Sequence, residues 1–224
     1  MNTLRSDPYI RELYDFAARR GFSESTFFGR ENQESYIRTA VDAYRDYALF
    51  RHVFQGQNDE KLFSKMMAVD FASRMAVMAG LAASDAYESV MLLEPPGAKK
   101  TGMPDYFRAA DLPSYTLLIH PEMYKLTAFE KYARKVREPF MDNKTWYLYI
   151  FATQKQYQNM GYGKKLMETV LSFADSKECR ICLETNEPDN VELYRHFGFT
   201  QVHYARYQGK LGHYVMLRKK VTGR

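Results

Sequence analysis

The chain has 224 residues, of which 46% are hydrophobic and 26% are charged, and this is the composition of an ordinary globular protein. Its net charge of +5 comes from 32 basic and 27 acidic residues that are scattered along the chain. That pattern argues against a nucleic-acid-binding surface. No signal peptide is visible, and the longest apolar stretch, residues 75–83, is too short to span a bilayer. We therefore expect a cytoplasmic protein without a membrane partner.

The N-terminal segment is predicted to contain one helix. Asp7 has the side chain of an N-cap, Pro8 stands in the first turn, and Gly21 follows the predicted end. Residues 25–29 are predicted to form a short strand. We interpret residues 1–33 as a helical extension that precedes the main domain.

The middle of the chain is predicted to change from helices to strands. Residues 31–54 and 58–76 carry apolar side chains at helical spacing. Residues 75–97 then read as two strands around a turn, stopped by a Pro-Pro-Gly sequence. Residues 99–144 form an aromatic helical interval, broken by prolines, of the kind that shapes a pocket or covers a face of a sheet.

The last third of the chain has the clearest organisation. Residues 146–152, "WYLYIFA", carry no charge and are predicted to form a central strand buried on both faces. A loop with two glycines, a helix, the strand "RICLET", a short helix and two final strands follow. This order predicts an α/β protein with a mixed sheet, in one domain over residues 34–224.

The two cysteines, Cys179 and Cys182, form a C-x-x-C pair, a spacing found in zinc and redox sites. The sequence has no second pair and no nearby histidine to complete a zinc site. We interpret the pair as two reduced thiols and predict no metal site.

The glycine loop precedes a helix, which is where proteins often bind phosphate. A P-loop needs serine or threonine directly after Gly163-Lys164, and a second lysine stands there. A dinucleotide-binding loop needs a third glycine at the position of Leu166. The remaining pattern is Gln158-x-x-Gly161-x-Gly163, in which glycines let the backbone approach an anion and free N–H groups point at it.

From Trp146 onward the sequence resembles the GNAT superfamily of acyl-CoA-dependent N-acyltransferases. The matching segments, in chain order, are "WYLYIFA", Gln158-x-x-Gly161-x-Gly163, "LETN" at residues 183–186, Asn190-x-x-x-Tyr194 and Gly198-Phe199. The earlier segments "LLEPPG" and "AYRDYALFRHVF" resemble the branch that includes puromycin N-acetyltransferase. The resemblance implies a GNAT-type fold that uses acetyl-CoA as co-substrate and needs no metal.

The resemblance also implies where coenzyme A binds. Its pyrophosphate would contact the backbone at the helix N-terminus, and its pantetheine arm would add to the strand edge near Phe151. The implied contact residues are Phe151, Ala152, Thr153, Gln158, Asn159, Met160, Gly161, Tyr162, Gly163, Lys164 and Asn190.

The catalytic roles follow from the same resemblance. Tyr194 would protonate the leaving thiolate, and a backbone N–H near Phe151 would stabilise the oxyanion. Glu184 is the first candidate for the general base, with Glu94 and His120 as further candidates.

The implied activity is transfer of an acetyl group from acetyl-CoA to the primary amine of a small molecule by direct attack. We expect a monomer or a homodimer. Two alternatives remain open. One is a protein or peptide N-acetyltransferase. The other is a non-catalytic CoA-binding regulatory module, because Asn159 and Met160 stand where the family usually has glycine and a basic residue.

Overall fold

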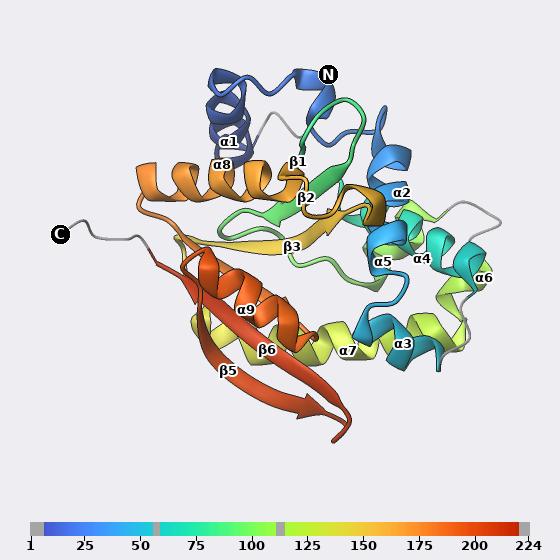
Figure 1. Ribbon diagram of the computed structural model, residues 1–224. Helices are drawn as coiled ribbons and strands as arrows, with labels where there is room; N and C mark the ends of the chain where they lie inside the picture. Colours follow the sequence, from blue (N-terminus) through green and yellow to red (C-terminus); the bar gives the residue numbers. More distant parts are fainter. Residues whose placement is uncertain (1–6, 56–58, 111–114, 220–224) are drawn as a thin grey trace.

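The computed structural model describes residues 7–55, 59–110 and 115–219 (Figure 1). In these parts of the chain, six strands form one mixed sheet in the order β1-β2-β3-β4-β6-β5. The strands are β1 (Ala79–Ala82), β2 (Ser89–Glu94), β3 (Thr145–Thr153), β4 (Arg180–Thr185), β5 (Thr200–Tyr207) and β6 (Leu211–Arg218). The pair β3–β4 is parallel and the other pairs are antiparallel. The predicted mixed α/β sheet is confirmed, with β3 near its centre.

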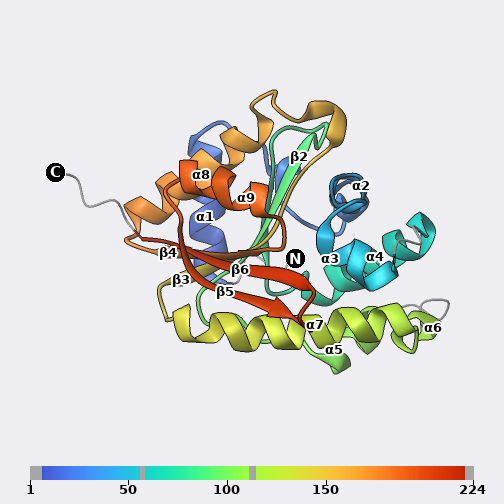
Figure 2. The same ribbon diagram turned by 60° about the horizontal axis from the view of Figure 1, so that its bottom comes forward.

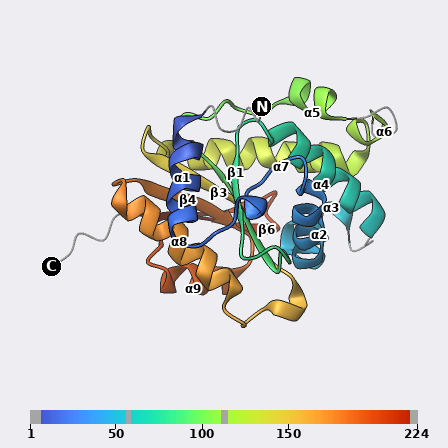
Figure 3. The same cartoon turned by 90° about the horizontal axis from the view of Figure 1, so that it is seen from above.

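Helices cover both faces of the sheet. They are α1 (Pro8–Arg19), α2 (Gln33–Tyr44), α3 (Ala48–Phe54), α4 (Glu60–Arg74), α5 (Met103–Ala109), α6 (Tyr115–Leu118), α7 (Pro121–Arg137), α8 (Tyr162–Ser176) and α9 (Pro188–His196). One core joins α1, α8 and α9 to the first face, and another joins α2, α3, α4 and α7 to the second (Figures 2 and 3). No helix in the described ranges is long and apolar enough to cross a membrane.

The N-terminal helix forms as predicted. The Asp7 carboxylate accepts hydrogen bonds from the N–H groups of Tyr9 and Ile10, at 2.9 and 3.1 Å, and so caps α1. The apolar face of α1 packs into the same core as α8. The strand predicted at residues 25–29 is absent: a 3₁₀ turn spans Glu24–Thr26, and only Phe27 forms a single β-bridge. The boundary at residue 33 stays a prediction.

A β-bulge divides β3 into two halves. Leu148 pairs with Leu93, whereas Ile150 pairs with Leu92, so Tyr149 is an extra residue on β3. Before the bulge, Leu148 packs in the core with α8; after it, Ile150 packs in the core on the opposite face. The bulge therefore re-aims the second half of the strand. The sequence, with its unbroken apolar character, did not reveal it.

An opening separates the ends of β3 and β4. Their pairing joins only Thr145–Leu148 to Arg180–Leu183. Beyond Leu148, the edge of β3 that faces β4 makes no ladder bonds with it. Below, "the opening" means the space between Tyr149–Thr153 and Glu184–Asn186.

Candidate functional site

The glycine loop presents backbone N–H groups at the start of α8. Gly161 is the N-cap and has φ +89°, a left-handed conformation that glycine adopts without strain. The helical bond from Lys165 N–H to the Gly161 carbonyl is 2.9 Å long. The N–H groups of the preceding turn have no intrahelical acceptor, and no side chain caps them. They and the helix dipole form a cradle suited to a phosphate group.

Gly163 has a different task from Gly161. A Cβ at this position would lie 3.1 Å from both the Phe151 ring and the Thr153 hydroxyl. The glycine therefore lets α8 approach the second half of β3 closely.

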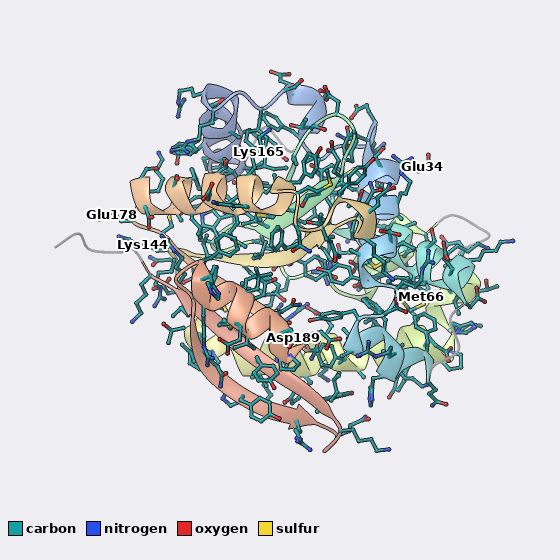
Figure 4. The ribbon with its side chains drawn as sticks, viewed as in Figure 1. Glu34, Met66, Lys144, Lys165, Glu178 and Asp189 are labelled. Atoms are coloured by element: carbon teal, nitrogen blue, oxygen red, sulfur yellow. The ribbon has the colours of Figure 1, made fainter. Side chains whose placement is uncertain are left out.

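The two lysines after this glycine point to different surroundings. Lys165, labelled in Figure 4, donates to the Ala83 carbonyl at 2.8 Å and lies over the Phe22 ring. Lys164 is exposed and lies 3.7 Å from Glu168. Of the pair, Lys164 is the one left to interact with an anion at the loop. The Met160 side chain is 61% exposed, so its replacement of a basic residue leaves the backbone cradle unchanged.

Helix α9 brings Asn190 and Tyr194 to the opening. The Asn190 amide donates to the Thr185 hydroxyl at 3.4 Å. The Tyr194 ring packs against Phe151, with ring centroids 6.4 Å apart. Burial, reinforced by the nearby phenols of Tyr44 and Tyr47, raises the pKa of Tyr194 well above its usual value. Tyr194 is therefore a neutral phenol with a proton to donate, and none of the described residues forms a hydrogen bond with its hydroxyl.

Two tyrosines at the junction of α2 and α3 reach the opening from the other face. The Tyr44 hydroxyl donates to the Phe151 carbonyl at 3.1 Å and accepts from the Phe151 N–H at 3.2 Å. The Tyr47 hydroxyl accepts from the Asn186 N–H at 2.6 Å and contacts the Thr185 hydroxyl at 3.0 Å. Burial raises the pKa of Tyr44 to about 12, so it too stays protonated.

The Glu184 side chain is 9% exposed and accepts three hydrogen bonds. The donors are the Tyr147 hydroxyl at 2.7 Å, Arg137 at 2.9 Å and His213 Nε2 at 3.1 Å. Burial alone would raise the pKa of Glu184, but Arg137, His213 and Tyr147 outweigh it and lower the pKa. The carboxylate therefore stays ionised at neutral pH.

Asp70 on α4 has a matching set of partners. The hydroxyls of Tyr149 and Tyr106 donate to it at 2.6 and 2.7 Å, and Arg74 Nε donates at 2.9 Å. Arg74 also lies over the Tyr149 ring, 4.2 Å from its centroid, as Arg137 lies over the Tyr147 ring at 4.0 Å. Each of the two β3 tyrosines thus donates to a carboxylate whose arginine stacks on the same ring.

Two more glutamates complete the network. Glu130 on α7 lies 3.1 Å from Arg137 and 3.8 Å from Arg74, so it bridges the two arginines. Glu94 pairs with Arg74 at 2.9 Å, and its pKa is raised, chiefly by burial. Arg134, a less buried arginine, also lies 3.8 Å from Glu130, so the network holds four carboxylates and three arginines.

This network lies beside a cavity of about 110 Å³ on the face of the sheet opposite α8. Its lining residues are Tyr44, Tyr47, Leu49, Phe50, Met67, Asp70, Arg74, Tyr106, Met123, Leu126, Thr127, Phe129, Glu130, Tyr147, Tyr149, Ile150, Glu184 and Asn186. Tyr44 and Tyr47 therefore border both the cavity and the opening. Within the described ranges, no cluster of three or more metal-ligating side chains occurs.

Residues 97–199 match the model of the acetyltransferase (GNAT) family. The chain has the GNAT acetyltransferase fold. No curated protein matches the chain.

Several solved structures align with most of the chain at low sequence identity. The C-terminal condensation domain of Ebony, in complex with β-alanyl-dopamine, aligns with TM-score 0.62 and 11% identity over 86% of this chain and 96% of its own. A Corynebacterium glutamicum protein, histone acetyltransferase HPA2 and related acetyltransferase, aligns with TM-score 0.56 and 16% identity over 88% of this chain and 97% of its own. Arylalkylamine N-acetyltransferase 2 from Aedes aegypti aligns with TM-score 0.54 and 14% identity over 86% of this chain and 97% of its own. At these identities the likeness concerns the fold.

Within this GNAT fold, the predicted site residues fall into two groups. The loop residues, Phe151–Thr153 and α9 meet at the opening, where Tyr194 packs on Phe151. Glu184 lies instead with the cavity network. The roles assigned to all of these residues stay predictions.

Several charged side chains of this network were not predicted from the sequence. Asp70 and Arg74 lie on α4, Glu130 and Arg137 on α7, and His213 on β6, so these three segments are far apart in the sequence and share no motif. One indication was present in β3. Tyr147 and Tyr149 alternate with apolar residues, which indicates that one face of the strand carries tyrosine hydroxyls.

Proposed function

We propose that the protein is an N-acetyltransferase that moves an acetyl group from acetyl-CoA to the primary amine of a small molecule. One observation carries the proposal: the opening lies between the helix N-terminus and a buried phenol on one face and a cavity on the other. Such an arrangement brings a thioester and an amine together from opposite sides. Bringing two reactants together in the right orientation removes much of the barrier to their reaction.

For donor binding, we propose that the pyrophosphate contacts the backbone of Gln158 to Lys164, at the N-terminus of α8. The pantetheine arm would lie along the edge of β3 from Phe151 to Thr153, with Asn190 beside it. Support comes from the free N–H groups at the start of α8 and from the β3 edge, which makes no ladder bonds with β4 beyond Leu148.

For the chemical step, the amine nitrogen attacks the thioester carbonyl carbon, a C–N bond forms, and the C–S bond then breaks. Tyr194 donates its proton to the departing sulfur. Its neutral state and its hydroxyl, which makes no hydrogen bond with the described residues, support this role. The displaced thiol leaves as free coenzyme A.

Glu184 is the proposed acceptor for the proton of the amine, because it is a carboxylate that lines the cavity. Its lowered pKa makes it a weak base. We therefore propose that it accepts the proton after attack, when the nitrogen carries a positive charge and is most acidic.

The size of the cavity favours a small acceptor over a polypeptide. A volume of about 110 Å³ lies well below the roughly 300–1,000 Å³ of pockets that hold drug-sized ligands. The surrounding tyrosines and the excess of carboxylates favour a compact cation over an anion. The resemblance of the sequence to the puromycin N-acetyltransferase branch also favours amines of low molecular mass.

The test is thiol release from acetyl-CoA with a panel of aliphatic amines, diamines, arylalkylamines and a short peptide. We expect turnover with at least one small amine and none with the peptide. Turnover only with the peptide would overturn the acceptor assignment. Tight acetyl-CoA binding without turnover on any amine would overturn the enzymatic proposal.

A further inference from the structure

The second half of β3 is not bare in the protein as it stands. Phe151 lies in this half of the strand, and its N–H and carbonyl both point away from β2. Both bond to the same atom, the hydroxyl oxygen of Tyr44, at 3.2 and 3.1 Å. Tyr44 comes from the end of α2, 107 residues earlier in the chain. A single phenol therefore occupies both hydrogen-bonding groups of this residue.

The proposed donor site needs those same two groups. A strand-like pantetheine arm pairs with backbone N–H and carbonyl groups on the edge it joins. A backbone N–H is one donor and makes one good hydrogen bond at a time. The Phe151 N–H therefore cannot bond to the Tyr44 hydroxyl and to the carbonyl of an incoming thioester together.

We propose that Tyr44 is a built-in competitor of the pantetheine arm, and that its hydroxyl leaves Phe151 when acyl-CoA binds. This inference rests on the proposed function. In the free protein Tyr44 keeps the edge of β3 paired, which avoids the cost of unpaired backbone groups and blocks addition of a foreign strand. On donor binding, the two bonds to Tyr44 are exchanged for two bonds to the ligand.

The neighbouring tyrosine shows why Tyr44 is the one that moves. Tyr47 bonds to the Asn186 N–H and the Thr185 hydroxyl on the opposite side of the opening. Just beyond it, the Ala48 N–H donates to the Glu187 carboxylate at 2.7 Å. Tyr47 is thus held in a turn anchored to the β4–α9 connection. Among the described residues, the Tyr44 hydroxyl forms hydrogen bonds only with the groups that the donor requires.

The competition predicts a substitution that tightens ligand binding while it weakens the fold. Tyr44→Phe keeps the ring and removes the hydroxyl, so the free state loses both bonds and the donor-bound state loses neither. We expect the Kd for acetyl-CoA to fall by about tenfold, because each hydrogen bond contributes modestly. We also expect a lower Tm for the unliganded variant.

The experiment compares two ligands by isothermal titration calorimetry. Acetyl-CoA reaches the edge of β3, whereas adenosine 3′,5′-bisphosphate lacks the pantetheine arm. Tyr44→Phe should lower the Kd for acetyl-CoA and leave the Kd for the bisphosphate unchanged. The matched control is Tyr14→Phe, because the Tyr14 hydroxyl likewise accepts a backbone N–H of the sheet, that of Gly80 at 3.1 Å, away from the opening. This variant should change neither affinity.

Several outcomes would overturn the inference. Unchanged or weaker acetyl-CoA binding by Tyr44→Phe would show that the hydroxyl does not compete, or that it binds the donor itself. An equal change in Kd for both ligands would show that the substitution disturbs the whole binding site and not the edge of β3 alone. If wild type binds neither ligand, the proposed function fails instead.

A measurement on the wild type serves if Tyr44→Phe does not fold. With carbon-13 at tyrosine Cζ, the Tyr44 signal should shift on addition of acetyl-CoA and stay in place with the bisphosphate. No selective shift would contradict the exchange.

Discussion

The two sides of the opening are built from different kinds of groups. At the glycine loop the polar groups are backbone N–H groups at a helix start, near the surface and without partners in the helix. At the cavity they are side chains, and Asp70 and Glu184 each already accept three hydrogen bonds.

This difference governs how each side tolerates substitution. A backbone cradle depends on conformation, so Asn159 and Met160 can replace the usual residues there without removing a ligand-binding group. A network of buried side chains depends on every member, because removing one leaves its partners unpaired. The following predictions test that contrast, from the largest expected effect to the smallest.

Removing Arg74 should have the largest effect. Arg74→Met leaves Asp70 and Glu94 without their cation, and breaking a buried pair in this way costs about 3–5 kcal/mol. Urea denaturation measures the loss in unfolding free energy. The control is Arg45→Met, since Arg45 pairs with Glu60 at the surface, where such pairs contribute about 1 kcal/mol or less. Equal losses for the two variants would contradict the contrast.

Removing the proposed acid should affect turnover and little else. Tyr194→Phe is expected to lower kcat about 100-fold, equivalent to about 2.7 kcal/mol of barrier. The Kd for acetyl-CoA should change by less than about threefold, because the phenol acts on the leaving group. Steady-state kinetics and calorimetry separate the two. Tyr204→Phe, at an exposed position on β5, is the control. Equal losses in kcat and affinity would count against the acid role.

The two glycines of the loop should respond differently to alanine. Gly163→Ala places a Cβ against Phe151 and Thr153, which pushes the start of α8 away from β3. We expect about tenfold weaker acetyl-CoA binding, or about 1.4 kcal/mol. Gly161→Ala meets no atom within 4 Å, and its positive φ costs about 1 kcal/mol of stability. If Gly161→Ala weakened acetyl-CoA binding more than Gly163→Ala, the importance assigned to the close approach at Gly163 would be contradicted.

The smallest expected effect is the pH dependence carried by Glu184. Its pKa in the folded protein is lowered from the ordinary 4.5, so the charged form contributes stability above that pH. The contribution is lost as the pH falls through the lowered pKa. The difference in unfolding free energy between wild type and Glu184→Gln should therefore shrink as the pH is lowered below 4.5. Glu168→Gln, at an exposed site on α8, is the control. If this difference in unfolding free energy grew as the pH was lowered, the lowered pKa of Glu184 would be contradicted.

The glycine loop could be predicted from the sequence better than the cavity, for the same reason. The cradle depends on local chain order, so Gly161 and Gly163 before a helix were enough to predict its place. The strand "WYLYIFA" and the mixed sheet also followed from local pattern. The cavity depends on contacts between distant segments: Asp70 meets Tyr149 across 79 residues and Tyr106 across 36. No spacing rule encodes such contacts, and the Tyr149 bulge is decided by pairing with β2 rather than by β3 alone.

The bulge has a consequence for changes in chain length. Side chains alternate along a regular strand, so losing one residue turns every later side chain to the other face. Tyr149 is an exception, because it is the extra residue between the pairs Leu148–Leu93 and Ile150–Leu92. Its deletion would restore a regular strand and leave Ile150 on the cavity face and Phe151 on the face of α8. The bulge is therefore a position at which β3 can lose a residue without exchanging the side chains that its two faces present, although Asp70 would lose the hydroxyl of Tyr149.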